Sequence, residues 1–166
     1  MDFIGVILAA GRGFRLKELA IDIPKGLLRV SESSLMERQI KCLAENAIKN
    51  IYIITGYAHE SILKTFGNSY EHYVEIHYLH NDRWNTANNI YSLYLAKDVA
   101  KEGFILINSD DLFHPEILRR LVEDESGEAI CVDDYKKLGK EEMKVRLEGG
   151  NLIEINKTMN PATAHG

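Results

Sequence analysis

Residues 3–16 read FIGVILAAGRGFRL, and this stretch decides the fold class. Its first half, residues 3–8, is a short and continuous apolar run with β-branched members, and Gly11 and Gly13 follow it. Such a run is typical of a buried strand in a parallel sheet, and the glycines indicate a loop at the strand's carboxyl end. Ligands of open α/β sheets bind at that end, so the stretch predicts a central strand leading into a functional loop.

Outward from this strand, helical and extended patterns alternate along the chain. Ser33 or Ser34 is the expected N-cap of the first helix, with Glu37 in its first turn, and Pro115 suits the first turn of the last helix. The alternation predicts an α/β fold, a three-layer sandwich with a mostly parallel central sheet. Helices are expected at 33–46, 58–66, 88–98 and 115–123, and strands at 51–55, 74–79 and 104–108.

The last third of the chain is rich in expected strands, at 129–132, 143–147 and 152–155, with a turn signal at 149–151. These strands are expected to add antiparallel members to the sheet. Residues 1–166 are expected to form a single domain. Because no closing helix follows residue 159, that domain is expected to lack its C-terminal portion.

The bulk composition limits the classes of function. A chain of 166 residues that is 45% hydrophobic suits one globular domain with a real core. Its net charge of −5 argues against a nucleic-acid partner, which would need clustered Lys and Arg. The absence of a long apolar run and of a basic N-terminal segment predicts a cytoplasmic protein without membrane contact. Cys42 and Cys131 lie in apolar segments and are expected to be buried, reduced thiols.

The loop at residues 8–16 is the first candidate for chemistry. Glycines let a backbone approach phosphate closely, and Arg12 and Arg15 could add charge-assisted hydrogen bonds. The loop is not a dinucleotide fingerprint, because Leu16 stands where a third glycine would be, and it is not a P-loop, because no Gly-Lys-Ser/Thr follows. A plain tight turn is the competing interpretation.

Two further segments carry charge beside apolar runs. Pro24 fixes the backbone before Lys25, which could direct the ammonium group to one place. A solvated surface lysine, the usual case for this residue, is the competing interpretation. Asp110 and Asp111 follow the expected strand 104–108, where Mg²⁺ would need one or two carboxylates beside substrate phosphates. A helix cap ahead of Pro115 is the alternative role, and it is assigned in part to Asp111.

Residues 81–94 combine amides with aromatic side chains. Amides pair with base edges and sugar hydroxyls, and aromatic rings offer stacking surfaces. A loop whose amides only cap the following helix explains the same composition, so both interpretations stay open.

Taken together, these segments resemble the nucleotidyltransferase superfamily of the glycosyltransferase-A-like fold. The family pattern Leu-Ala-Ala-Gly-x-Gly-Ser/Thr-Arg, then Pro-Lys, then a strand-end Asp is similar to residues 8–15, 24–25 and Asp110. Asn88-Asn89-Ile90-Tyr91-Ser92-Leu93 and Glu142-Met143-Lys144-Val145 resemble segments of cytidylyltransferases acting on phosphocholine or 2-aminoethylphosphonate. Phe14 departs from the pattern, since it replaces the small hydroxyl residue of the loop.

The resemblance implies a nucleotide-diphospho-sugar transferase-like fold and a reaction. CMP would pass from CTP to a small phosphorylated or phosphonylated acceptor with release of pyrophosphate, with Lys25 and Arg15 as catalytic residues and Asp110 as the Mg²⁺ ligand. A homodimer is compatible with it, as are a sugar- or inositol-1-phosphate acceptor and a non-catalytic nucleotide-binding module. The implied nucleotide-binding residues are Leu8, Ala9, Ala10, Gly11, Arg12, Gly13, Lys25, Thr86, Ala87, Asn88 and Asn89. The acceptor's amine would be held by Asp133, Tyr135 and Glu142, with Asp134 beside them.

Overall fold

The computed structural model describes residues 3–12, 23–133, 135, 137–139 and 142–165. It contains two compact units, Met1–Val122 and Glu123–Gly166, and each is described by itself. In the described part of the chain, no helix is both long enough and apolar enough to cross a membrane.

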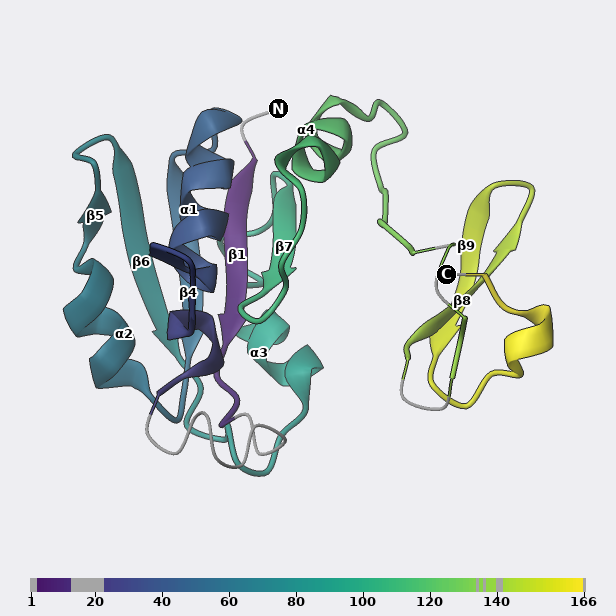
Figure 1. Ribbon diagram of the computed structural model, residues 1–166, viewed down its shortest axis with the longest axis horizontal. Coiled ribbons are helices and arrows are strands. Elements are labelled where there is room, and N and C mark those ends of the chain that lie inside the picture. Colours follow the sequence, from purple (N-terminus) through teal and green to yellow (C-terminus); the bar gives the residue numbers. More distant parts are fainter. Residues whose placement is uncertain (1–2, 13–22, 134, 136, 140–141, 166) are drawn as a thin grey trace. The chain divides into compact units, whose positions relative to one another are not determined.

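The first unit is built on a five-stranded sheet in the order β5-β6-β4-β1-β7 (Figure 1). The apolar run of the N-terminal segment forms β1 (Ile4–Ala9), which pairs in parallel with β4 (Asn50–Thr55) and β7 (Phe104–Asn108). β6 (Val74–His80) extends the sheet in parallel beyond β4, and β5 (Ser69–Tyr70) closes that edge as its antiparallel member. The mostly parallel sheet is therefore confirmed, with β1 at its centre.

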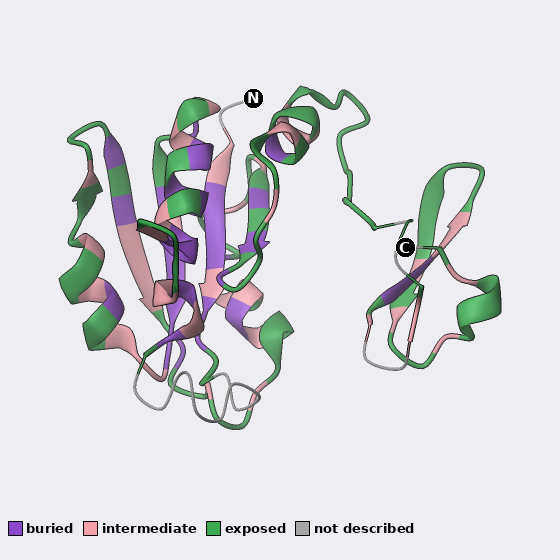
Figure 2. Cartoon of the chain, in the orientation of Figure 1, coloured by how far each residue is buried: buried purple, intermediate pink, exposed green. Residues whose placement is uncertain are grey.

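Helices cover both faces of this sheet, which confirms the three-layer arrangement. One core cluster joins the sheet to α1 (Leu35–Glu45), α2 (His59–Phe66) and α4 (Pro115–Glu123). On the opposite face, Val6 and Ile54 pack with Ala96 and with the side chains of α3 (Asn89–Leu95). Buried positions concentrate on the central strands in Figure 2, as expected for strands covered on both faces.

The start of α1 is fixed by a capping box, as its sequence indicated. The Ser34 hydroxyl accepts from the backbone N–H of Glu37 at 3.1 Å, and the Glu37 carboxylate accepts from the backbone N–H of Ser34 at 3.3 Å. This reciprocal pair satisfies donors that a helix start leaves unpaired. The 3₁₀ turn η2 (Lys25–Leu27) and a small hairpin of β2 (Arg29–Val30) and β3 (Ser33–Ser34) lead into this helix.

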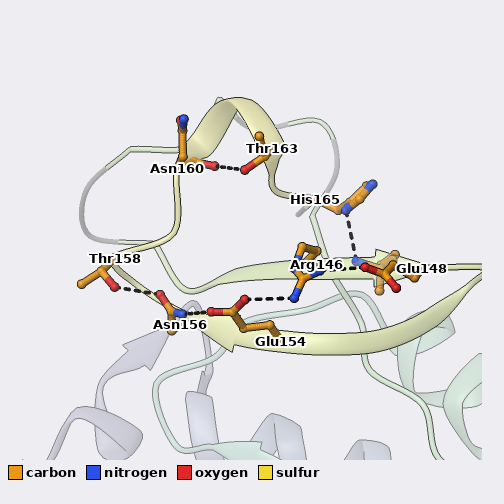
Figure 3. A network of polar contacts seen from close by, with 9 residues as sticks. Arg146, Glu148, Glu154, Asn156, Thr158, Asn160, Thr163 and His165 are labelled. Carbon is orange, nitrogen blue, oxygen red and sulfur yellow. Dashed lines mark hydrogen bonds and ion pairs between the residues drawn. The ribbon is translucent and has the colours of Figure 1, made fainter.

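The second unit is a β-hairpin with a short return of the chain. β8 (Lys144–Glu148) pairs antiparallel with β9 (Asn151–Asn156), and the connecting Gly149 and Gly150 both have positive φ angles. Arg146 donates to Glu148 on its own strand and to Glu154 on β9 (Figure 3). Beyond the 3₁₀ turn η3 (Pro161–Thr163), His165 pairs with Val145 as an isolated antiparallel bridge.

Three expectations about the last third of the chain are wrong. The strands β8 and β9 form a sheet of their own, and the antiparallel member of the central sheet is β5 instead. Residues 129–132 form no strand, since no strand among the described residues pairs with their backbone, and Ile130 and Val132 are exposed. Cys131 is exposed as well, whereas Cys42 is buried as expected, and both thiols are free.

Candidate active site

Three loops meet at the carboxyl edge of the sheet in the first unit. They follow β1, β4 and β6, and backbone hydrogen bonds join them in series. The N–H of Tyr57 donates to the carbonyl of Ala10 at 3.1 Å, and the N–H of Asn81 donates to the carbonyl of Thr55 at 2.8 Å. The loop of Ala10, Gly11 and Arg12 is therefore held in place by the neighbouring strand ends.

Gly56 allows the close approach of these loops. A Cβ at this position would lie 2.5 Å from Cβ of Trp84 and 2.7 Å from the carbonyl oxygen of Ala10. Either the Ala10 backbone or the Trp84 loop would then have to move.

Gly56→Ala is therefore expected to lower the free energy of unfolding by about 1–3 kcal/mol, the usual cost of overpacking. Denaturant unfolding of the wild-type and Gly56→Ala proteins would measure the difference in unfolding free energy. Gly11→Ala is the matched control, because a Cβ at Gly11 meets no described heavy atom within 4 Å and its stability should be unchanged. Equal stability of the Gly56→Ala and Gly11→Ala proteins would mean that the loops have room to separate.

Neither backbone conformation nor a contact with the described residues requires glycine at position 11. Its φ angle is not in the left-handed region, and the space around its missing side chain is open. The tight-turn interpretation therefore loses its basis at this position. Open space beside an exposed backbone suits the approach of a ligand.

An aromatic pair lies against this loop, and sequence patterns alone did not single it out. The rings of Tyr57 and Trp84 are 5.3 Å apart between centroids and tilted by 60°. The guanidinium of Arg12 lies 4.9 Å from the centroid of the Tyr57 ring. The Arg12 side chain therefore extends toward the loop after β4, and its role in phosphate binding stays a prediction. The signal for Tyr57 was its place directly after the glycine that ends β4.

Lys25 and Asp110 form an ion pair at the same edge. Lys25 Nζ lies 2.7 Å from Asp110 Oδ2, and the two side chains are 26% and 43% exposed. Pro24 precedes the turn of Lys25, and Gly26 packs so closely that a Cβ there would lie 3.0 Å from Cβ of Ser109. The turn is thereby held against the end of β7, so Lys25 is not a solvated surface lysine.

Asp111 has a different role from its neighbour. Its Oδ2 accepts from the backbone N–H of Asn108 at 3.2 Å and from the Asn108 side-chain amide at 3.1 Å. Desolvation raises the pKa of Asp111 despite these hydrogen bonds, which lower it. The carboxylate thus closes the turn after β7, and the expectation that it caps the helix before Pro115 is wrong.

The amide-rich segment after β6 splits into a structural and an exposed part. Asn81 is buried, with its side chain donating to Ser92 at 2.9 Å and accepting from the N–H of Arg83 at 2.8 Å. Asn88 occupies the N-cap position of α3, but its side chain makes no capping hydrogen bond. The capping interpretation therefore fails at Asn88, and Asn81 instead closes an Asx turn with Arg83 and holds Ser92 of α3.

The expected nucleotide-binding residues fall into three groups. Leu8, Ala9, Ala10, Gly11, Arg12 and Lys25 lie in the first unit around the sheet edge, and so do Thr86, Ala87, Asn88 and Asn89 after β6. Gly13 and Arg15 lie outside the described residues, as does Phe14.

The expected acceptor-binding residues belong to the second unit. The carboxylate of Asp133 accepts from the N–H of Tyr135 at 3.0 Å, and Glu142 accepts from the N–H of Gly139 at 2.9 Å. The Tyr135 residue is 97% exposed. Asp134 lies outside the described residues.

The donor set at the sheet edge suits Mg²⁺ bound together with phosphates. Within the described ranges, no three His, Cys, Asp or Glu side chains cluster as a site built from protein ligands alone would require. Asp110 offers a partly exposed carboxylate at a strand end. Because Mg²⁺ commonly takes one or two carboxylates and fills its shell with substrate oxygens and water, Asp110 fits such an ion.

Comparison with known proteins agrees with this geometry. The chain is 36% identical over 159 residues to "Bifunctional IPC transferase and DIPP synthase" of Aquifex aeolicus, covering 93% of this chain and 35% of that protein. It is 37% identical over 108 residues to the choline-phosphate cytidylyltransferase of Streptococcus pneumoniae, covering 65% of this chain and 45% of that one. The chain therefore spans less than half the length of these two relatives.

A solved structure shows the same fold. The inositol-1-phosphate CTP transferase from T. maritima superposes with a TM-score of 0.72 at 22% identity, covering 99% of this chain and 68% of that chain. The model of the family described as "Nucleotidyl transferase" matches residues 4–137 of this chain. The matched range includes β1, the Lys25 turn and Asp110 at the end of β7. The protein is a member of the nucleotidyl transferase family.

Proposed function

We propose that this protein is a Mg²⁺-dependent cytidylyltransferase. It transfers CMP from CTP to a small acceptor of the phosphocholine or 2-aminoethylphosphonate type and releases pyrophosphate. The observation that carries the proposal is the pairing of Lys25 with Asp110 beside the Gly11 loop. A cation and a carboxylate are thereby available next to a backbone that is open to phosphate.

The reaction needs positioning and charge neutralisation more than covalent chemistry. An anionic oxygen of the acceptor attacks the α-phosphorus, a new P–O bond forms, and the bond from that phosphorus to the β-phosphate oxygen breaks. The electron pair leaves with pyrophosphate, so no general base is required.

The residues of the chain have separate tasks in this scheme. The backbone at Gly11, with Arg12 and Arg15, binds the triphosphate. Lys25 neutralises charge at the α-phosphate. Asp110 would hold Mg²⁺, which when bound supplies positive charge to the nucleotide and acceptor oxygens. Thr86, Ala87, Asn88 and Asn89 contact the base.

Two classes of acceptor are candidates. The similarity to a choline-phosphate cytidylyltransferase favours a zwitterionic phosphate. A hexose or inositol 1-phosphate is the second candidate, because the structural neighbour from T. maritima is an inositol-1-phosphate CTP transferase.

Pyrophosphate release from CTP across an acceptor panel tests the function. Release with phosphocholine or 2-aminoethylphosphonate, and little with glucose or inositol 1-phosphate, is the expected pattern. The reverse pattern would reassign the acceptor. Nucleotide binding without turnover on any acceptor, with Mg²⁺ plentiful, would make the protein a binding module.

CTP is expected to bind more tightly than GTP or ATP, by on the order of tenfold, which is about 1.4 kcal/mol. The exposed amides of Asn88 and Asn89 can pair with the edge of a cytosine, whereas a purine differs in both size and hydrogen-bonding edge. Calorimetry with the three nucleotides would measure the difference. Equal affinities would remove the basis for the cytidylyl assignment.

A further inference from the structure

Asp110 lies inside a tight turn at the end of β7. The N–H of Asp111 donates to the carbonyl of Asn108 at 3.0 Å, which closes residues 108–111 into a turn. The N–H of Ser109 donates to the carbonyl of Leu8 at 3.0 Å, which joins this turn to β1. The direction of the Asp110 carboxylate therefore depends on how firmly the turn is held.

Gln39 of α1 binds this turn at both ends. Its Nε2 donates to the carbonyl of Asn108 at 2.9 Å and to the carbonyl of Asp111 at 2.7 Å. A primary amide nitrogen carries two hydrogens, so each carbonyl can receive one. The two carbonyls bracket Asp110 in sequence, and α1 thereby fixes the backbone on both sides of the carboxylate.

The side-chain oxygen of Gln39, unlike its nitrogen, accepts no hydrogen bond from the described residues. Gln39 is only 2% exposed, and its Oε1 has no hydrogen-bond partner among the residues that the structure describes. An unpaired buried acceptor costs stability, so an apolar side chain of similar length would suit a position that served packing alone. The two donor contacts to the turn explain why an amide stands here.

We propose that Gln39 is a positioning residue for the metal-binding carboxylate of Asp110, an inference that rests on the proposed function. Gln39 holds the backbone of the turn, and Lys25 holds the carboxylate itself at 2.7 Å. Gln39 touches neither the Gly11 loop nor Lys25 through any hydrogen bond in the described part of the chain. Its effect should therefore be limited to steps in which Mg²⁺ takes part.

The test replaces Gln39 with methionine and with asparagine. Methionine is similar in length and has no donors, whereas asparagine keeps the amide but is too short to span both carbonyls. Calorimetry would measure CTP affinity over a series of MgCl₂ concentrations, and steady-state assays would separate kcat from KM. The Mg²⁺ concentration for half-maximal effect is expected to rise by on the order of tenfold or more, as is usual when a group supporting a metal ligand is removed. The affinity for CTP without Mg²⁺ should be unchanged, and kcat should fall while the KM for the acceptor stays the same.

Ile40→Val is the matched control, because Ile40 is the next residue of the same helix, is fully buried, and packs in the core cluster. It is expected to lower thermal stability while leaving the Mg²⁺ dependence at its wild-type value. If Ile40→Val shifts the Mg²⁺ dependence as far as the Gln39 variants do, Gln39 has only a structural role. An unchanged Mg²⁺ dependence in the Gln39 variants overturns the inference as well.

Asp110→Asn separates this inference from the function on which it rests. If Asp110→Asn loses the Mg²⁺ dependence and the Gln39 variants keep it, the inference about Gln39 is wrong and the site assignment stands. If Asp110→Asn keeps the Mg²⁺ dependence, the assignment of the metal ligand fails, and the role of Gln39 fails with it. Should Gln39→Met not fold, Gln39→Asn still decides the question, because it retains a polar amide in the same core position.

Discussion

Asp110→Asn is expected to abolish CMP transfer, a loss on the order of 10³-fold or more in kcat. Asparagine has nearly the same shape but no charge, so it cannot neutralise a divalent ion as a carboxylate does. The fold should remain, because the Lys25–Asp110 pair is partly exposed and such pairs contribute about 0–1 kcal/mol to stability. Turnover assays, with calorimetric titration of MgCl₂ in the presence of CTP, would measure the effect.

Asp111→Asn is the control for this prediction. The Asp111 side chain accepts hydrogen bonds from Asn108 through one oxygen, and an asparagine oxygen can accept the same two bonds. This variant should keep its Mg²⁺-dependent CTP binding and most of its turnover. If Asp111→Asn loses metal-dependent binding while Asp110→Asn retains it, the two roles are reversed.

Much of the first unit could be predicted from short-range patterns. The continuous apolar runs became β1, β4 and β7. β1 and β4 are inner strands covered on both faces, which favours apolar residues at nearly every position. β7 is an edge strand, and its Phe104 and Leu106 are exposed. The start of α1 was equally predictable, because Ser34 and Glu37 form a capping box through contacts between residues only three positions apart. The helix after Pro115 also has the expected bounds.

The errors fell where an outcome depends on distant partners. Residues 129–132 have the composition of a strand, but a strand forms only where a neighbour satisfies its backbone. For the same reason, the pattern of residues 143–156 predicted two strands correctly but did not reveal that they form a sheet separate from the central one.

In the candidate site too, single residues could be predicted from the sequence, whereas their long-range contacts could not. The sequence indicated Lys25 and Asp110 separately, although they are 85 positions apart, and only the fold brings them within 2.7 Å. The role of Gln39 could not be predicted, because a glutamine on an amphipathic helix is ordinarily a surface residue and its contacts are with two backbone carbonyls of a distant turn. The contact of Trp84 with Gly56 was likewise hidden, since nothing in either segment specifies the other.

Lys25→Ala is expected to reduce kcat by on the order of 10²-fold or more, about 3 kcal/mol of transition-state stabilisation. The ammonium lies beside Asp110 and opposes the negative charge that develops at the α-phosphate. The same variant should bind Mg²⁺ more tightly in the absence of nucleotide, because the Asp110 carboxylate then loses the cation that occupies it. Turnover and metal affinity are thus expected to change in opposite directions, which simple loss of folded protein would not produce.

Lys64→Ala provides the control, since Lys64 is exposed in the last turn of α2 and should alter neither quantity. Turnover at the wild-type rate in Lys25→Ala would leave the lysine with no more than a structural ion pair to Asp110.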